Sequence, residues 1–92
     1  MNAQKAEVVG LQALGWLAGQ EDLLGIFLGS TGAAPGDLRA RAQEAEFLAS
    51  VLDFLLMDDG WVIAFCDDAG MPYAAPMQAR AALPGGAATH WT

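Results

Sequence analysis

Cysteine and histidine are almost missing from this chain of 92 residues, which has one of each, Cys66 and His90. A single cysteine cannot form an internal disulfide or a thiolate metal cluster. Nucleophilic catalysis by serine usually needs a histidine within hydrogen-bond reach, and Ser30 and Ser50 both lie far from His90 in sequence. We therefore expect no catalytic centre, no metal site and no other cofactor. The sequence predicts that the protein is not an enzyme.

Positive charge is also scarce, because 4 Lys and Arg stand against 11 Asp and Glu, for a net charge of -7. Proteins that bind nucleic acid use Lys and Arg to neutralise phosphates, so this balance argues against such a partner. An acidic surface favours a basic protein partner instead. Polar residues also interrupt the apolar runs, which fall short of the about 20 residues that a membrane span needs. The first residues do not show the pattern of a signal peptide, so we expect a cytoplasmic protein without a membrane partner.

Strand signals are missing too, since no segment alternates β-branched and polar residues between tight turns. Ala and Leu at helical spacing dominate, and 54% of the residues are hydrophobic. The sequence predicts an all-α fold, a compact bundle of five to six short helices, in one domain over residues 1–86 with a short tail at 87–92. The expected helices cover residues 3–18, 20–31, a short segment that begins at Pro35, and then 44–57, 59–69 and 72–83. Within the last of these, Pro76 fits best in the first turn, so the helix could begin near residue 75.

Glycines mark the predicted helix ends, and we expect left-handed stops at Gly19, Gly32 and Gly70. The first helix is apolar nearly all round, which predicts a position in the centre of the bundle. The second helix should bury most of its apolar residues, which are Leu23, Leu24, Ile26, Phe27 and Leu28.

The chain resembles itself when it is shifted by 38 residues, which places Leu14, Leu17, Phe27 and Gly32 on Leu52, Leu55, Phe65 and Gly70. One more residue of shift aligns the Ala-Arg-Ala segments at 40–42 and 79–81. Repeated helical units have periods in this range, so the bundle could consist of two three-helix halves. Chance matching is the competing interpretation, because Ala and Leu are abundant.

Two motifs resemble ligand-binding loops but lack residues that such loops require. Residues 29–36 are rich in glycine, but they lack the lysine and the preceding strand of a phosphate loop. Asp58, Asp59 and Gly60 could open a calcium loop, but Ala69 occupies the twelfth position, where a closing Glu is required. A helix stop with a turn explains the first motif, and a helix N-cap explains the second.

Five residues form a candidate interaction surface: Trp61, Asp67, Asp68, Arg41 and Arg80. Tryptophan anchors interfaces when exposed, although burial is the commoner alternative. The two Asp residues oppose the dipole at a helix C-terminus, and pairing with Arg80 would make them ordinary surface acids. Cys66 shares a helical stripe with apolar residues, which predicts a buried thiol.

Several segments resemble domain-of-unknown-function family 3572, a family of short alphaproteobacterial proteins. They are LQALGWLA at 11–18, LGIFL at 24–28, DLRARA at 37–42, FLASVLDFLL at 47–56 and ARAALPG at 79–85. The resemblance covers nearly the whole chain, apart from residues 87–92. It implies an all-helical bacterial protein and brings no activity, cofactor or catalytic residue. The family's genes lie near response-regulator genes, which implies a role in signalling or regulation.

Three functions remain open at this point. The apolar excess, the acidic surface and the lack of catalytic groups favour a non-catalytic protein-interaction module, whose unknown partner is another protein or a second copy of the chain. A DNA-binding regulator is the alternative, since residues 32–42 could form a helix-turn-helix corner. The third is a small enzyme or carrier with an apolar pocket.

Overall fold

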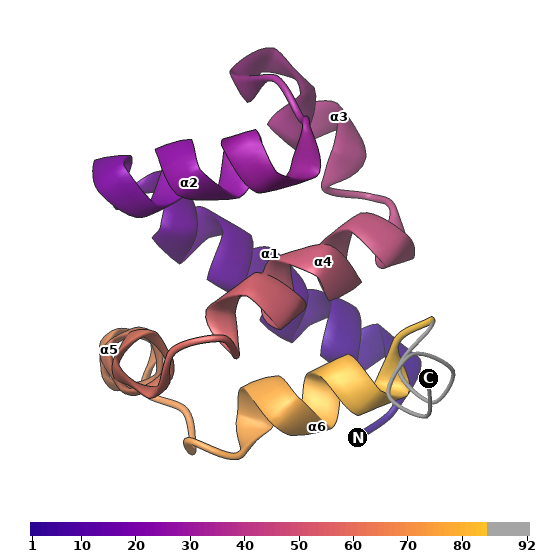
Figure 1. Cartoon of the computed structure of the whole chain (residues 1–92). Helices are drawn as coiled ribbons and strands as arrows, with labels where there is room; N and C mark the ends of the chain where they lie inside the picture. Colours follow the sequence, from indigo (N-terminus) through magenta and orange to yellow (C-terminus); the bar gives the residue numbers. More distant parts are fainter. Residues whose placement is uncertain (85–92) are drawn as a thin grey trace.

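The computed structural model describes residues 1–84, and the part of the chain that it describes is helical without strands (Figure 1). In order, the elements are α1 (Ala3–Ala18), α2 (Glu21–Thr31), the 3-10 turn η1 (Pro35–Asp37), α3 (Leu38–Arg41), α4 (Ala45–Leu55), α5 (Asp59–Ala69) and α6 (Ala75–Ala82). They form a compact body of 29 × 27 × 25 Å. The all-α prediction is confirmed; the predicted tail with His90 and Trp91 lies outside the described residues.

Side-chain caps begin two of the longer helices. The Oδ1 atom of Asn2 accepts a hydrogen bond from the backbone N–H of Lys5 at 2.7 Å, at the start of α1. Asp58 does the same for α5, where its Oδ1 accepts from Gly60 at 2.8 Å and from Trp61 at 3.2 Å. Each cap satisfies backbone donors that have no partner inside the helix.

Two of the three predicted glycine stops are confirmed. Gly32 and Gly70 adopt left-handed conformations, with φ of 74° and 69°, after α2 and α5. Gly19 does not, because its φ is -84°. Its N–H donates to the carbonyl of Trp16 at 3.1 Å, so the last turn of α1 tightens and needs no left-handed residue.

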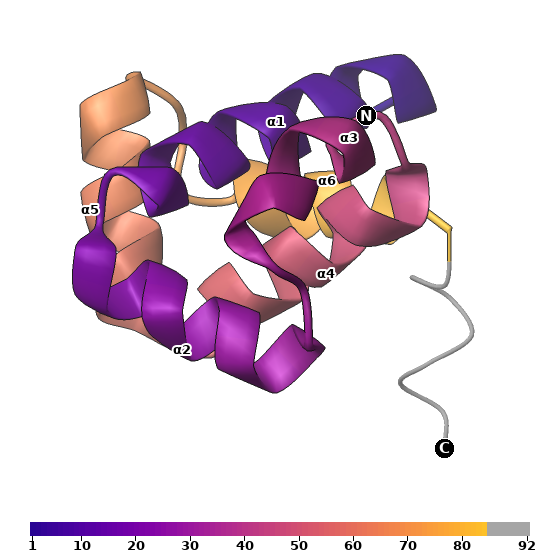
Figure 2. The same cartoon turned by 90° about the horizontal axis from the view of Figure 1, so that it is seen from above.

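The long helix α1 contacts α2, α4, α5 and α6, yet it is not enclosed by them. Figure 2 shows α1 along one edge of the molecule, with α2, α4 and α6 on one side of it and α5 beside its C-terminal end. The covered face buries Ala6, Val9, Ala13, Leu14 and Leu17. Val8 and Leu11 on the outer face are each 51% exposed. The expectation of a central first helix is therefore wrong, because the neighbours cover only one of its apolar faces.

Helix α2 buries less than its composition predicts. Phe27 is its only buried residue, Leu23, Leu24 and Leu28 are half-buried, and Ile26 is 56% exposed. The Phe27 ring meets the rings of Phe47 and Phe54 edge to face, with centroids 5.8 and 5.4 Å apart. Phe27 is thus the main anchor of α2 on the bundle. Leu23, Leu24 and Leu28 pack at the edge of the core, and Ile26 stays at the surface.

The 38-residue shift pairs α1 with α4 and α2 with α5, and the second of these pairs is alike. Helices α2 and α5 have 11 residues each, bury Phe27 and Phe65, and end at left-handed glycines. The third helices differ, since α3 has 4 residues whereas α6 has 8 and packs on α1 and α4. The two halves therefore match in element order and in the glycines that end their second helices, but not in their N-caps or in how they close the bundle.

Candidate functional site

A groove between α5 and α6 gathers most of the apolar side chains that this corner of the molecule leaves exposed. We define the α5–α6 groove by the residues that line it: Leu56, Asp59, Val62, Ile63, Tyr73 and Met77. It encloses about 410 Å³. Ile63 is 46% exposed, Tyr73 56% and Met77 66%. Single exposed apolar residues are ordinary on a protein surface, whereas a contiguous set in a hollow makes this groove the candidate site.

The groove exists because α5 is apolar on two faces. Phe65 lies on one face and packs into the core, with Trp61 half-buried beside it. Val62, Ile63 and Cys66 lie on another face at spacings of 3 and 4 residues, which brings them into one stripe. The segment after Gly70 turns back along this second stripe and covers only its C-terminal end, so Ile63 stays open to solvent.

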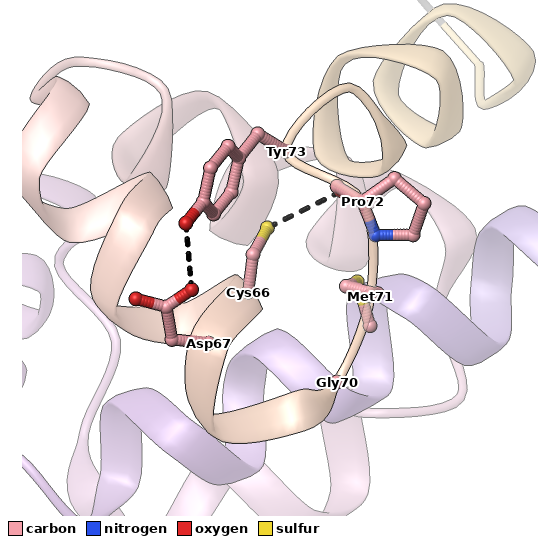
Figure 3. Close-up of a pocket in the computed structure, with 6 residues that line it drawn as sticks. All are labelled: Cys66, Asp67, Gly70, Met71, Pro72 and Tyr73. Carbon is pink, nitrogen blue, oxygen red and sulfur yellow. Dashed lines mark hydrogen bonds between the residues drawn. The ribbon is translucent and has the colours of Figure 1, made fainter.

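A second hollow adjoins the groove at Tyr73, which lines both (Figure 3). Cys66, Asp67, Gly70, Met71 and Pro72 complete its lining. The Tyr73 hydroxyl donates a hydrogen bond to Oδ1 of Asp67 at 2.8 Å, and the Cys66 thiol donates to the carbonyl of Pro72 at 3.5 Å. The hydrogen bond to Asp67 raises the pKa of Tyr73, and the negative carboxylate beside the hydroxyl adds to the effect. At neutral pH the tyrosine therefore stays a neutral donor, which holds its ring between the two hollows.

Cys66 is a buried thiol, as predicted, with 1% of its surface exposed. Burial raises the pKa of the Cys66 thiol, and the charge of Asp67 raises it further. Because the thiolate is the reactive form, both effects disfavour reaction of the Cys66 sulfur near neutral pH.

Native Cys66 should consequently react with iodoacetamide at least about ten times more slowly than the same residue in urea-denatured protein. Mass spectrometry of timed samples measures both rates. Equal rates in the folded and unfolded protein would contradict the burial of this thiol.

Trp61 and Asp68 lie on the side of α5 that carries Phe65, which is not the side of the groove. Trp61 is half-buried and stacks on Phe54, with centroids 4.9 Å apart and planes at 22°. Asp68 accepts a hydrogen bond from Nε1 of Trp16 at 2.8 Å. This bond connects α5 to α1 and offsets the cost of a carboxylate at a helix C-terminus.

The predicted pairing of Asp67 and Asp68 with Arg80 is wrong. The Nε atom of Arg80 lies 2.6 Å from Oδ1 of Asp53 on α4, and its Nη1 donates to the carbonyl of Pro84 at 3.2 Å. Asp53 lies 27 residues before Arg80 and reaches it because α4 packs against α6. The ion pair therefore joins two helices rather than neutralising the end of α5.

Arg41 lies on α3, away from α5 (Figure 1). Its guanidinium carbon is 4.5 Å from the centroid of the Phe47 ring, and its Nε is 3.7 Å from Glu44. The five candidate residues are thus spread over three helices and do not form one surface. Asp67, beside Tyr73, is the one that adjoins the α5–α6 groove.

The sequence interpretation missed Ile63, Tyr73 and Met77. A signal for Ile63 was present, because the apolar residues of α5 continue from Phe65 past Val62 and Cys66 to Ile63, which is a wider stripe than a surface helix needs. The segment 32–42, taken as an alternative helix-turn-helix corner, contains a helix of a single turn, α3. Recognition helices place several side chains into the major groove, and one turn presents few of them.

Across residues 1–84, no cluster of three His, Cys, Asp or Glu side chains is placed to hold a metal ion. Helices long and apolar enough to cross a membrane are likewise missing from this stretch.

The fold and the groove define a small all-α domain with an open apolar hollow at one corner. Its sequence matches the family described as protein of unknown function (DUF3572) over residues 3–86. The chain belongs to this family, as its sequence segments had suggested. No curated protein and no solved structure matches it.

Proposed function

We propose that this chain is a non-catalytic domain that binds a protein partner, and that the α5–α6 groove is its contact surface. The observation that carries the proposal is the contiguous exposure of Ile63, Tyr73 and Met77 around a hollow with an apolar floor. Burying these side chains would contribute about 25 cal/mol per Å² of apolar area removed from water. Hollows lined by apolar residues, with a few polar groups at their edge, are typical binding sites.

A second apolar surface, on the outer face of α1, competes for this role. Its hollow of about 310 Å³ is lined by Val8, Leu11, Ala42 and Leu48, together with Gln4, Glu7 and Gln43. Three polar side chains interrupt it, whereas Asp59 is the one charged residue in the lining of the α5–α6 groove. Desolvating polar groups reduces the gain from burial, so the α5–α6 groove is the better candidate.

The test is affinity capture with the full chain from cells that express it naturally, followed by quantitative mass spectrometry. The substitution Met77→Asp introduces a charge at an exposed position in the groove, where Met77 is 66% exposed. Recovery of the partner should fall at least about tenfold, because the partner's apolar atoms would have to desolvate the new carboxylate. The free energy of unfolding should change by less than about 0.5 kcal/mol, since the position is at the surface.

Leu11→Asp is the matched control, because it places the same charge on the competing apolar surface, where Leu11 is 51% exposed. A captured protein that depends on Met77 and not on Leu11 supports the proposal. Capture that Met77→Asp leaves unchanged, or no reproducible capture at all, overturns it. A groove that binds a second copy would appear as a dimer in light scattering that Met77→Asp converts to monomer.

A further inference from the structure

We infer that the occupant of the α5–α6 groove is an amphipathic helix with basic residues on either side of its apolar stripe. The inference rests on the proposed function of the groove and adds the chemistry of the partner. It follows from the length of the hollow, from the charges at its two ends, and from the side chains along it.

The length of the groove matches a short helical segment. Its walls along α5 run from Asp59, through Ile63, to Asp67 in the adjoining hollow. The 8 residue steps from Asp59 to Asp67 span about 12 Å of helix, which is a little over two helical turns. A partner helix lying along α5 would bury apolar side chains at positions i, i+3 or i+4, and i+7. Met77 forms part of the opposite wall, and its flexible side chain can adapt to different apolar shapes.

Both ends of this path are negative. Asp59 lines one end, and the Asp67 carboxylate, one oxygen of which accepts the Tyr73 hydroxyl, lies at the other. A carboxylate oxygen can accept more than one hydrogen bond, so Asp67 can still receive a cation. Asp67 also lies near the C-terminus of α5, where the helix dipole adds negative potential and no basic residue occupies the last turn.

Within residues 1–84, no ion pair joins Asp59 or Asp67 to a Lys or Arg side chain. Neither hollow has Lys or Arg in its lining. Arg80, on the helix that forms the opposite wall, is paired with Asp53. Lysine or arginine side chains about seven positions apart on a partner helix would match the spacing of Asp59 and Asp67. A second copy of this chain fits less well, because its net charge is -7 and like charges repel.

The experiment selects ligands without presupposing their charge. A phage-displayed library of helix-forming peptides of about 18 residues, long enough to hold a helix in water, is selected on the full chain. We expect groove-binding peptides with Lys or Arg about seven positions apart around an apolar stripe. Their affinity, measured by isothermal titration calorimetry, should fall about tenfold with Met77→Asp and about threefold to tenfold with Asp67→Asn. It should also weaken as salt is raised.

The control is Asp37→Asn, which removes one negative charge at the turn before α3, outside both hollows. It should leave the affinity unchanged, because exposed charges beyond the screening length contribute little. Selected peptides that depend on Met77 but are neutral or acidic, or that bind the Asp67→Asn chain equally well, overturn this inference and leave the groove as a binding site. A second copy that occupies the groove in light scattering overturns this inference alone, because the groove would still be the contact surface. If no selected peptide depends on Met77, both proposals fail.

Discussion

Replacing Phe27 with alanine should lower the free energy of unfolding by about 3–5 kcal/mol, the usual cost of removing a buried aromatic ring. The ring is 0% exposed and is the only buried side chain of α2. Its removal deletes two edge-to-face contacts at once, those with Phe47 and Phe54. Because a small domain has about 5–15 kcal/mol of stability in total, this loss should leave α2 barely docked.

Urea denaturation followed by far-ultraviolet circular dichroism measures the change, and hydrogen exchange shows whether α2 opens before the rest of the bundle. The matched control is Ile26→Ala in the same helix, where the side chain is 56% exposed. Both substitutions introduce alanine, which has a higher helix propensity than the residue it replaces. The gain in helix propensity stabilises each variant and does not account for a large difference between them. Ile26→Ala should change stability by less than about 1 kcal/mol. Similar losses for the two variants would contradict the role of Phe27 as the main anchor of α2.

The helix boundaries were predictable because their signals are local. Gly32 and Gly70 end α2 and α5 in the left-handed conformation that glycine adopts without strain, and Asp58 caps α5 from the residue before it. At Gly19 the local signal gave the wrong conformation. Its position after an apolar helix predicts a left-handed stop, but a tightened last turn ends the helix equally well.

The sides of the helices that are buried were less predictable, because burial depends on where other helices pack. Apolar residues surround both α1 and α2, so periodicity alone could not identify Val8, Leu11 or Ile26 as exposed. The ion-pair partner of Arg80 was unpredictable for the same reason, because it also depends on helix packing. Asp67 and Asp68 are nearer in sequence than Asp53, but the packing of α4 against α6 brings Asp53 to the guanidinium.

The candidate groove was unpredicted for a related reason. Its walls come from α5, from the end of α4 and from the segment around Tyr73 and Met77, and only the turn at Gly70 brings them together. The charge of the site was predictable from the sequence. The acidic residue Asp67 was a candidate, and the predicted basic protein partner matches the ligand that we infer. The sequence does not reveal that Asp68, the neighbour of Asp67, already accepts a hydrogen bond from Trp16.

The closest approach between α1 and α4 should make two glycines of the same helix respond oppositely to the same substitution. A Cβ atom added at Gly10 would lie 2.9 Å from the Cβ of Leu48, whereas one added at Gly15 would meet nothing within 4 Å. Alanine favours a helix over glycine by about 1 kcal/mol, so Gly15→Ala should stabilise the protein by about that amount.

Gly10→Ala gains the same propensity but must push α4 away, because the contacted atom sits at the base of the Leu48 side chain and cannot move alone. Overpacking of this kind costs about 1–3 kcal/mol. The two variants should therefore differ by about 1–3 kcal/mol in urea denaturation, with Gly10→Ala the less stable. Equal stabilisation by both would mean that α1 and α4 lie farther apart than the structure has them. Because the substitution is chemically identical at both sites, the difference between them measures the helix contact without the contribution of helix propensity.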